Sequence, residues 1–212
     1  MNLIEIKNRL YTKNLTPGKT VYGERLIRQN NIEFREWDAK RSKLAAAISK
    51  GVKNPIKKRD IVLYLGAATG TTSSHVSDLV DKDGFVFALD FAPRVLRQLV
   101  YVCEQRKNMT PLLEDANHPE NYKEKITKVD VIYQDIAQKN QVEILIKNAN
   151  LFLKRNGCAL IAIKSRSIDV TKKPELIFNE VKEELKKRFK IMEFKKLEPF
   201  QKDHCFFVCI NK

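Results

Sequence analysis

The stretch IVLYLGAATGTT at residues 61–72 decides the fold of this chain. An apolar run leads into two glycines that lie four positions apart, and two threonines then begin a helix-like segment. This order predicts a buried strand, a tight turn and a helix N-terminus, which is the usual start of a nucleotide-type ligand site. Asp90 closes the next apolar run, residues 85–89, and suits the hydroxyls of a bound ribose.

The glycine spacing narrows the class of ligand. A dinucleotide fingerprint requires another glycine where this chain has Ala68, so that the backbone can approach a pyrophosphate. A P-loop requires a longer gap and a lysine where this chain has Thr71. S-adenosylmethionine has no pyrophosphate, and a looser turn is sufficient for its amino-acid end. The spacing therefore favours S-adenosylmethionine as cofactor, while a plain strand-to-helix turn without a ligand stays the alternative.

From residue 60 onward, strand-like and helix-like segments alternate. Strands are expected at residues 61–65, 85–89, 110–113, 129–133, 158–163, 191–197 and 205–210. Helices are expected at residues 72–80, 93–107, 141–153 and 174–189, the third closed by Asn156-Gly157. This alternation predicts an α/β fold with a doubly wound, mostly parallel seven-stranded sheet, Rossmann-like, that ends in an antiparallel hairpin. That layout is typical of class I methyltransferases.

The first fifty residues follow another pattern. Short β-type segments at residues 3–6, 20–22 and 32–37 are separated by turn signals, and a helix is expected at residues 41–49. A loop rich in lysine follows at residues 51–58. We therefore expect a small N-terminal β-rich appendage at residues 1–55 and a methyltransferase domain at residues 56–212.

The charge of the chain is strongly positive and uneven. The net charge is +14, and residues 1–60 alone contain 15 Lys+Arg against 6 Asp+Glu. This excess favours a polyanionic partner, above all nucleic acid. The alternative is that the lysines serve only to keep the protein soluble, which would also give a positive net charge. Arg35, Lys40 and Arg41 are expected to lie on a basic face that holds RNA backbone beside the cofactor or docks a protein partner.

The cysteine pattern and the length of the apolar runs indicate the cellular compartment of the protein. Cys103, Cys158, Cys205 and Cys209 form no C-x-x-C pair, so we expect buried free thiols in a reducing cytoplasm and no metal site. No apolar run approaches the length of a membrane span. The N-terminus does not have the basic segment and the following long apolar segment that are typical of a signal peptide. A cytoplasmic location without a membrane partner is expected.

Ionisable residues follow successive strands of the predicted sheet. They are Asp90, Asp115, Asp135 and Lys164. Ligands of open α/β sheets bind beyond the carboxyl ends of the strands, so these side chains are candidates for the site. Lys164 cannot be buried without a partner, and Asp135 on the neighbouring strand is the expected one. A surface lysine just past the strand end is the alternative.

Several motifs together resemble the fibrillarin family over nearly the whole chain. They are TPGKTVYGE at 16–24, REWD at 35–38, RSKLAAAI at 41–48, YLGAA at 64–68, DANHP at 115–119, DVIYQDIAQ at 130–138 and LEPFQKDH at 197–204. The chain has no Gly/Arg-rich extension and so resembles the compact archaeal type. It departs from the family at Asp90, where glutamate is common.

The resemblance implies methyl transfer from S-adenosylmethionine to ribose 2′-hydroxyls of rRNA and tRNA. The implied partners are a box C/D guide RNA, a Nop-domain scaffold protein and a kink-turn-binding ribosomal-like protein. The implied catalytic residues are Lys43, Asp135, Lys164 and His204. The cofactor is expected against Gly66, Thr71, Thr72, Asp90, Phe91, Asp115, Ala116, Asp135, Ile136, Ala137 and Gln138.

We assign Lys164 as base or alkoxide stabiliser, Asp135 as the group that orients it, and Lys43 as a source of positive potential. The resemblance leaves the role of His204 open. Two alternatives come from other classes of protein. One is a non-catalytic RNA-binding scaffold, and the other is a nicotinamide-dependent dehydrogenase, against which Ala68 argues.

Overall fold

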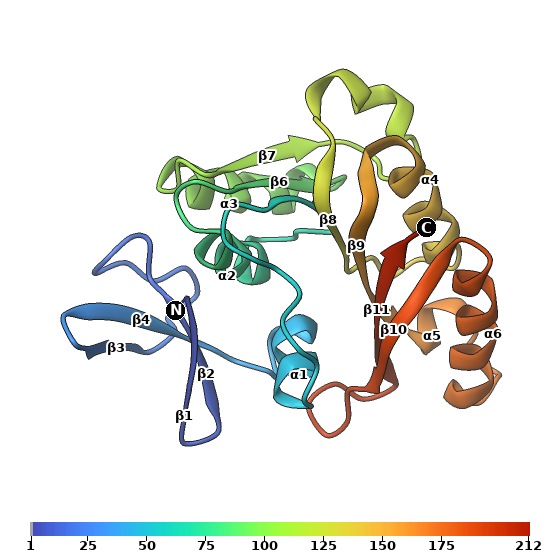
Figure 1. Cartoon of the computed structure of the whole chain (residues 1–212), viewed down its shortest axis with the longest axis horizontal. Coiled ribbons are helices and arrows are strands. Elements are labelled where there is room, and N and C mark those ends of the chain that lie inside the picture. The colour runs from blue at the N-terminus through green and yellow to red at the C-terminus, as the bar shows by residue number, and fades with distance from the viewer. Residues whose placement is uncertain (1) are drawn as a thin grey trace.

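The computed structural model describes residues 2–212, and its larger sheet has seven strands in the order β10-β11-β9-β8-β5-β6-β7 (Figure 1). The strands are β5 (Ile61–Leu65), β6 (Phe85–Asp90), β7 (Met109–Leu113), β8 (Val129–Gln134), β9 (Leu153–Lys164), β10 (Phe189–Lys196) and β11 (His204–Asn211). Neighbours from β9 to β7 pair in parallel, whereas β11 is antiparallel to both β9 and β10. The predicted doubly wound sheet with a terminal hairpin is confirmed.

Helices cover both faces of this sheet. They are α2 (Thr71–Val80), α3 (Pro93–Glu104), α4 (Gln141–Phe152), the short α5 (Ser165–Ile168), α6 (Pro174–Lys186) and the 3₁₀ helix η1 (Pro119–Lys125). In β5, Val62 and Tyr64 belong to the core under α2 and α3. Leu63 and Leu65 belong to the core under α4 and α6. Because both faces are buried, the strands are continuously apolar and do not alternate.

The N-terminal residues form a second, antiparallel sheet in the order β1-β2-β4-β3. Its strands are β1 (Leu3–Ile6), β2 (Arg9–Lys13), β3 (Leu26–Gln29) and β4 (Ile32–Trp37). The carboxamide of Asn2 donates hydrogen bonds to the backbone oxygens of Asp78 and Leu79 near the end of α2. Helix α1 (Lys43–Ser49) contacts β2 and β11, and Figure 1 shows it between the small sheet and the terminal hairpin.

The structure corrects the sequence reading at several boundaries. Residues 20–22 form a loop, while β2 and β3 were not expected. Helix α4 is not closed by Asn156-Gly157, because Leu153 already pairs with Val129 and begins β9. Helix α6 ends at Lys186, because Phe189 pairs with Asn211 in the terminal hairpin. In both cases strand pairing overrides the helical pattern.

The cysteines are buried free thiols, as predicted: Cys103, Cys158, Cys205 and Cys209. Burial raises the pKa of Cys103 to about 12, which makes its thiol unreactive near neutral pH. Within residues 2–212, no helix combines the length and the apolar character that crossing a membrane requires.

Candidate active site

A cavity of about 270 Å³ lies at the carboxyl ends of the central parallel strands. Its walls are Gly66, Ala68, Leu89, Asp90, Phe91, Glu114, Asp115, Ala116, Asp135, Ile136, Ala137 and Gln138. Every residue that we expected at the cofactor lines this cavity except Thr71 and Thr72. Sequence reasoning missed Ala68, Leu89 and Glu114, which lie next to predicted residues and could have been found from the strand ends.

Gly66 lets the turn after β5 approach the end of β8 closely. Its φ is +84°, and a Cβ atom on it would lie 2.5 Å from the backbone oxygen of Asp135. The backbone nitrogens of Gly66 and Ala67 both donate to the oxygen of Leu89, at 2.9 and 3.0 Å. No larger residue fits here without moving the backbone that forms the cavity floor.

The carboxylate of Asp90 joins two loops at the cavity rim. One oxygen accepts the backbone N–H of Ala68 at 2.9 Å, and the other accepts that of Ala92 at 3.0 Å. Each carboxylate oxygen can accept a further hydrogen bond, and Asp90 lines the cavity. This geometry suits a pair of ligand hydroxyls.

Asp115 holds the loop that follows β7. Its carboxylate accepts the backbone N–H and the side-chain amide of Asn117, both at 2.9 Å. The hydrogen bond from the backbone of Asn117 is the largest cause that lowers the pKa of Asp115, so this carboxyl is ionised at neutral pH. Asn117 also donates to Gln138 at 3.0 Å, which ties this loop to the loop after β8.

The structure places Thr71 and Thr72 beside the cavity, at the first turn of α2. The hydroxyl of Thr72 is directed to α1, where it donates to Ser42 at 3.0 Å. Ser42 is the N-cap of α1, and its hydroxyl accepts the backbone N–H of Ala45. Thr71 lines a neighbouring cleft.

Lys43, the first residue of α1, reaches the cavity from the N-terminal part of the chain. Its ammonium lies 2.7 and 3.0 Å from the two carboxylate oxygens of Asp135, which itself lines the cavity. Both side chains are partly exposed, so solvent reaches the pair.

Asp135 therefore does not orient Lys164 as expected. Lys164 is exposed, and it makes no ion pair in the part of the chain that the structure describes. The register of β9 and β11 pairs Lys164 with His204, which places the two residues side by side at the strand ends. The charge on Lys164 is thus available to a ligand.

His204 has a defined tautomer. Its Nδ1 lies 2.6 Å from the backbone oxygen of Lys202, so Nδ1 carries the proton and donates it, leaving Nε2 as an acceptor. Burial is the main cause that lowers the pKa of His204, and the charges of Lys43 and Lys164 act in the same direction. The charge of Asp135 raises the pKa of His204. The charges of the other three predicted catalytic residues therefore all act on His204, which indicates that the four residues lie near one another.

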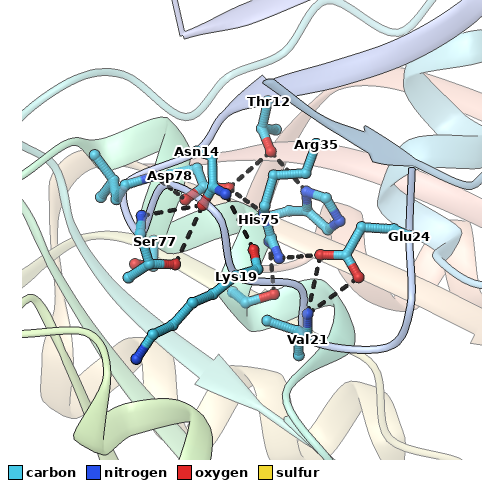
Figure 2. Close-up of polar contacts among 12 residues, drawn as sticks. Thr12, Asn14, Lys19, Val21, Glu24, Arg35, His75, Ser77 and Asp78 are labelled. Atoms are coloured by element: carbon cyan, nitrogen blue, oxygen red, sulfur yellow. Dashed lines mark hydrogen bonds and ion pairs between the residues drawn. The ribbon is translucent and has the colours of Figure 1, made fainter. Parts of the chain in front are cut away.

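The N-terminal sheet is attached to α2 by a buried charge cluster (Figure 2). Arg35 is completely buried, and its guanidinium donates to Asp78 and to Ser74 at 2.8 Å each, and also to Glu24. The other carboxylate oxygen of Asp78 accepts from Arg106 at 2.7 Å. The expectation that Arg35 lies on a basic face is wrong, because its charge is neutralised inside the protein.

His75 completes this attachment. Its Nδ1 lies 2.7 Å from the hydroxyl of Thr12, its Nε2 lies 2.8 Å from that of Tyr22, and its ring stacks on Trp37. Burial and then the charges of the neighbouring arginines lower the pKa of His75 well below its usual value. The ring is therefore neutral at physiological pH.

Comparison with known proteins places these features in a family. The family model of fibrillarin matches residues 1–212. The fibrillarin-like rRNA/tRNA 2′-O-methyltransferase of Pyrococcus horikoshii is 55% identical over 201 residues, which cover 94% of this chain and 88% of that protein.

Two crystal structures extend the likeness to three dimensions. Aeropyrum pernix fibrillarin, in complex with natively bound S-adenosyl-L-methionine, is 44% identical with a TM-score of 0.89, over 98% of this chain and 92% of that one. A chain of the fibrillarin/Nop5p complex is 42% identical with a TM-score of 0.93, over 100% of this chain and 98% of that one.

Proposed function

The chain belongs to the fibrillarin family, and from this we propose that it transfers a methyl group from S-adenosylmethionine to ribose 2′-hydroxyls of rRNA and tRNA. One observation carries the proposal. Asp135 lines the cavity at the strand ends and also holds the ammonium of Lys43, so the ligand site and the charged pair share a residue.

The cavity fits the cofactor. The ionised carboxylate of Asp115 and the free lone pairs of Asp90 are acceptors for ribose hydroxyls and amino groups, and Gly66 leaves room for the ligand. Asp90, where the family commonly has glutamate, accepts the same hydrogen bonds with a shorter side chain. When bound, adenosylmethionine supplies a methyl group that its sulfonium charge has already activated.

The residues around the cavity must then position the ribose and remove one proton. The unprotonated Nε2 of His204 accepts the proton of the 2′-hydroxyl, because its lowered pKa keeps it in the basic form at neutral pH. The exposed ammonium of Lys164 stabilises the negative charge that develops on the oxygen. Lys43 fixes the carboxylate of Asp135 at the cavity wall and adds positive potential to the site.

The partners follow from the same family. A Nop-domain protein is the scaffold, as in the fibrillarin/Nop5p complex. We further propose that a box C/D guide RNA selects the target and that a kink-turn-binding ribosomal-like protein completes the particle. The net charge of +14 supports an RNA partner. We also propose that the methyltransferase domain begins at residue 56 and that the protein is located in the cytoplasm.

A transfer assay tests the function. Labelled adenosylmethionine is incubated with the full chain, a Nop-domain scaffold protein, a guide RNA and its matched target RNA. Label is expected on one ribose of the target and is expected to disappear when that ribose is a 2′-deoxyribose. Cofactor binding without transfer under any assembly would favour the non-catalytic scaffold and contradict the proposal.

A further inference from the structure

Asn117 connects two walls of the cofactor cavity. It lies in the loop between β7 and η1, and its side chain bonds both to Asp115 in the same loop and to Gln138 in the loop after β8. Asp115 and Gln138 line the cavity, whereas Asn117 does not. Two residues that face the ligand are therefore held by a third residue outside the cavity wall.

The hydrogen bonds of Asn117 fix which end of its carboxamide faces which neighbour. An ionised carboxylate only accepts hydrogen bonds, so the group of Asn117 that lies 2.9 Å from Oδ1 of Asp115 is its NH2. The oxygen of Asn117 points the other way, where it accepts the side-chain NH2 of Asn140 at 2.8 Å. Asn140 is the N-cap of α4, so this carboxamide is held from two elements.

The same NH2 group orients Gln138. It donates to Oε1 of Gln138 at 3.0 Å, so the oxygen of this second carboxamide is turned toward Asn117. The NH2 of Gln138 is then directed away from Asn117, and among residues 2–212 it has no hydrogen-bond partner. Because Gln138 lines the cavity, its NH2 is available to donate to a ligand.

Asp115 supplies an acceptor beside this donor. Its Oδ1 accepts both the backbone N–H and the side-chain NH2 of Asn117, whereas its Oδ2 accepts no hydrogen bond from the described part of the chain. Oδ1 of Asp115 and Oε1 of Gln138 lie within 3.0 Å of one nitrogen, so the two side chains are adjacent. The cavity wall thus offers a free acceptor next to a free donor.

This pair matches one kind of base edge. Adenine has an amino group, a donor, next to ring nitrogens that accept. Hypoxanthine has a carbonyl oxygen in place of the amino group and a proton on the adjacent ring nitrogen. The carbonyl oxygen would meet the carboxylate of Asp115, and the ring N–H would meet the NH2 of Gln138. Both contacts would then be unsatisfied, which costs more than a hydrogen bond contributes.

We propose that Asn117 is a positioning residue for cofactor selection, which orients Gln138 as a donor and Asp115 as an acceptor and so makes the cavity prefer an amino-bearing base. Asn117 acts through these two neighbours and does not touch the cofactor. The inference rests on the proposed function, since it takes the cavity as the site of the adenosyl cofactor.

Calorimetry with two ligands that differ only in the base tests the proposal. S-adenosylhomocysteine and S-inosylhomocysteine are titrated into the full chain, and wild type is expected to prefer the adenosyl ligand about 100-fold. Asn117→Ala is expected to reduce this preference about tenfold, mainly by weakening the binding of the adenosyl ligand. Asn121→Ala, which removes an exposed asparagine of η1, is expected to leave the preference unchanged.

Asn117→Asp gives a second, sharper comparison. The new side chain has two acceptor oxygens, so Gln138 bonds to it only through its NH2 and turns its own oxygen toward the cavity. The new carboxylate also repels Asp115. The preference for the adenosyl ligand is therefore expected to fall further than in Asn117→Ala. Urea unfolding shows that each variant is folded at the temperature of the titration.

A merely structural role of Asn117 predicts another pattern. Equal weakening of both ligands in Asn117→Ala, with an unchanged preference, would show that the residue only holds the loop and would overturn the proposal. Unchanged affinities for both ligands would overturn it as well. If wild type binds the two ligands equally well, this inference alone fails. If wild type binds neither ligand, the proposed function fails and this inference fails with it.

Discussion

The hydroxyls of Thr72 and Ser42 are joined by a hydrogen bond of 3.0 Å. This bond connects the first turn of α2, beside the cofactor cavity, to the N-cap of α1. Lys43 follows Ser42 directly and holds Asp135. The position of the ion pair therefore depends on a contact between two helix N-termini.

Ser42→Ala is expected to lower both stability and turnover. The variant loses the N-cap of α1, which costs about 1 kcal/mol of unfolding free energy. It also loses the hydrogen bond from Thr72 that connects α1 to α2. Urea unfolding measures the first effect and single-turnover methyl transfer the second. Ser42→Thr, which retains a hydroxyl, is expected to restore most of the rate. A wild-type single-turnover rate in a destabilised Ser42→Ala would show that the contact is structural only.

Lys43→Ala is expected to reduce the transfer rate about 10²-fold, because the ion pair that fixes the Asp135 carboxylate at the cavity is lost. Since the two residues act as a pair, the double variant with Asp135→Ala should be little slower than either single variant. Lys50→Ala removes the same charge at the other end of α1 and is the control. Multiplicative losses in the double variant would refute the coupling.

Asp90→Ala is expected to weaken cofactor binding at least about tenfold. The variant loses an acceptor for the ligand and two hydrogen bonds that hold the rim loops. Asp90→Glu, the residue common in the family, should bind nearly as well as wild type. Isothermal calorimetry measures the affinity, and Asp83→Ala, at an exposed loop position, is the control. Equal affinities for all variants would exclude Asp90 from the site.

Arg35→Ala is expected to destabilise the chain by about 3–5 kcal/mol, because Asp78 and Glu24 stay buried with one cation fewer. Urea unfolding gives this difference directly. Arg28→Ala, which removes an exposed arginine of β3, should cost less than about 1 kcal/mol. A small effect of Arg35→Ala would show that the cluster does not attach the N-terminal sheet.

Stability is expected to decrease as the pH falls below about 6.5. The pKa of His75 and that of His204 are lower in the folded protein, so the unfolded chain binds more protons in this range. Their contribution is fully present above the unfolded pKa and is lost on acidification, by at most about 1.4 kcal/mol per pH unit for each group. His75→Gln should flatten the profile of unfolding free energy, whereas His118→Gln, at an exposed position, should not.

Much of the fold follows from local pattern. The apolar runs of the large sheet, such as Ile61–Leu65, could be assigned because strands buried on both faces lack polar positions. The turn at Gly66 and the acids after the strands indicate the cavity, because parallel strands bring their carboxyl ends to one edge. The element ends at Leu153 and Phe189 could not be assigned, because partner strands distant in sequence decide them.

The sequence by itself determined the family, the sheet and the residues that surround the cavity. Only the tertiary structure decided which of these residues bond to one another. Asp135 pairs with Lys43, 92 positions away, and not with Lys164 on the neighbouring strand. Arg35, which the charge pattern placed on a basic face, is buried against Asp78. Such contacts depend on how α1 and the N-terminal sheet pack on α2, and this packing cannot be predicted from the spacing of residues along the sequence.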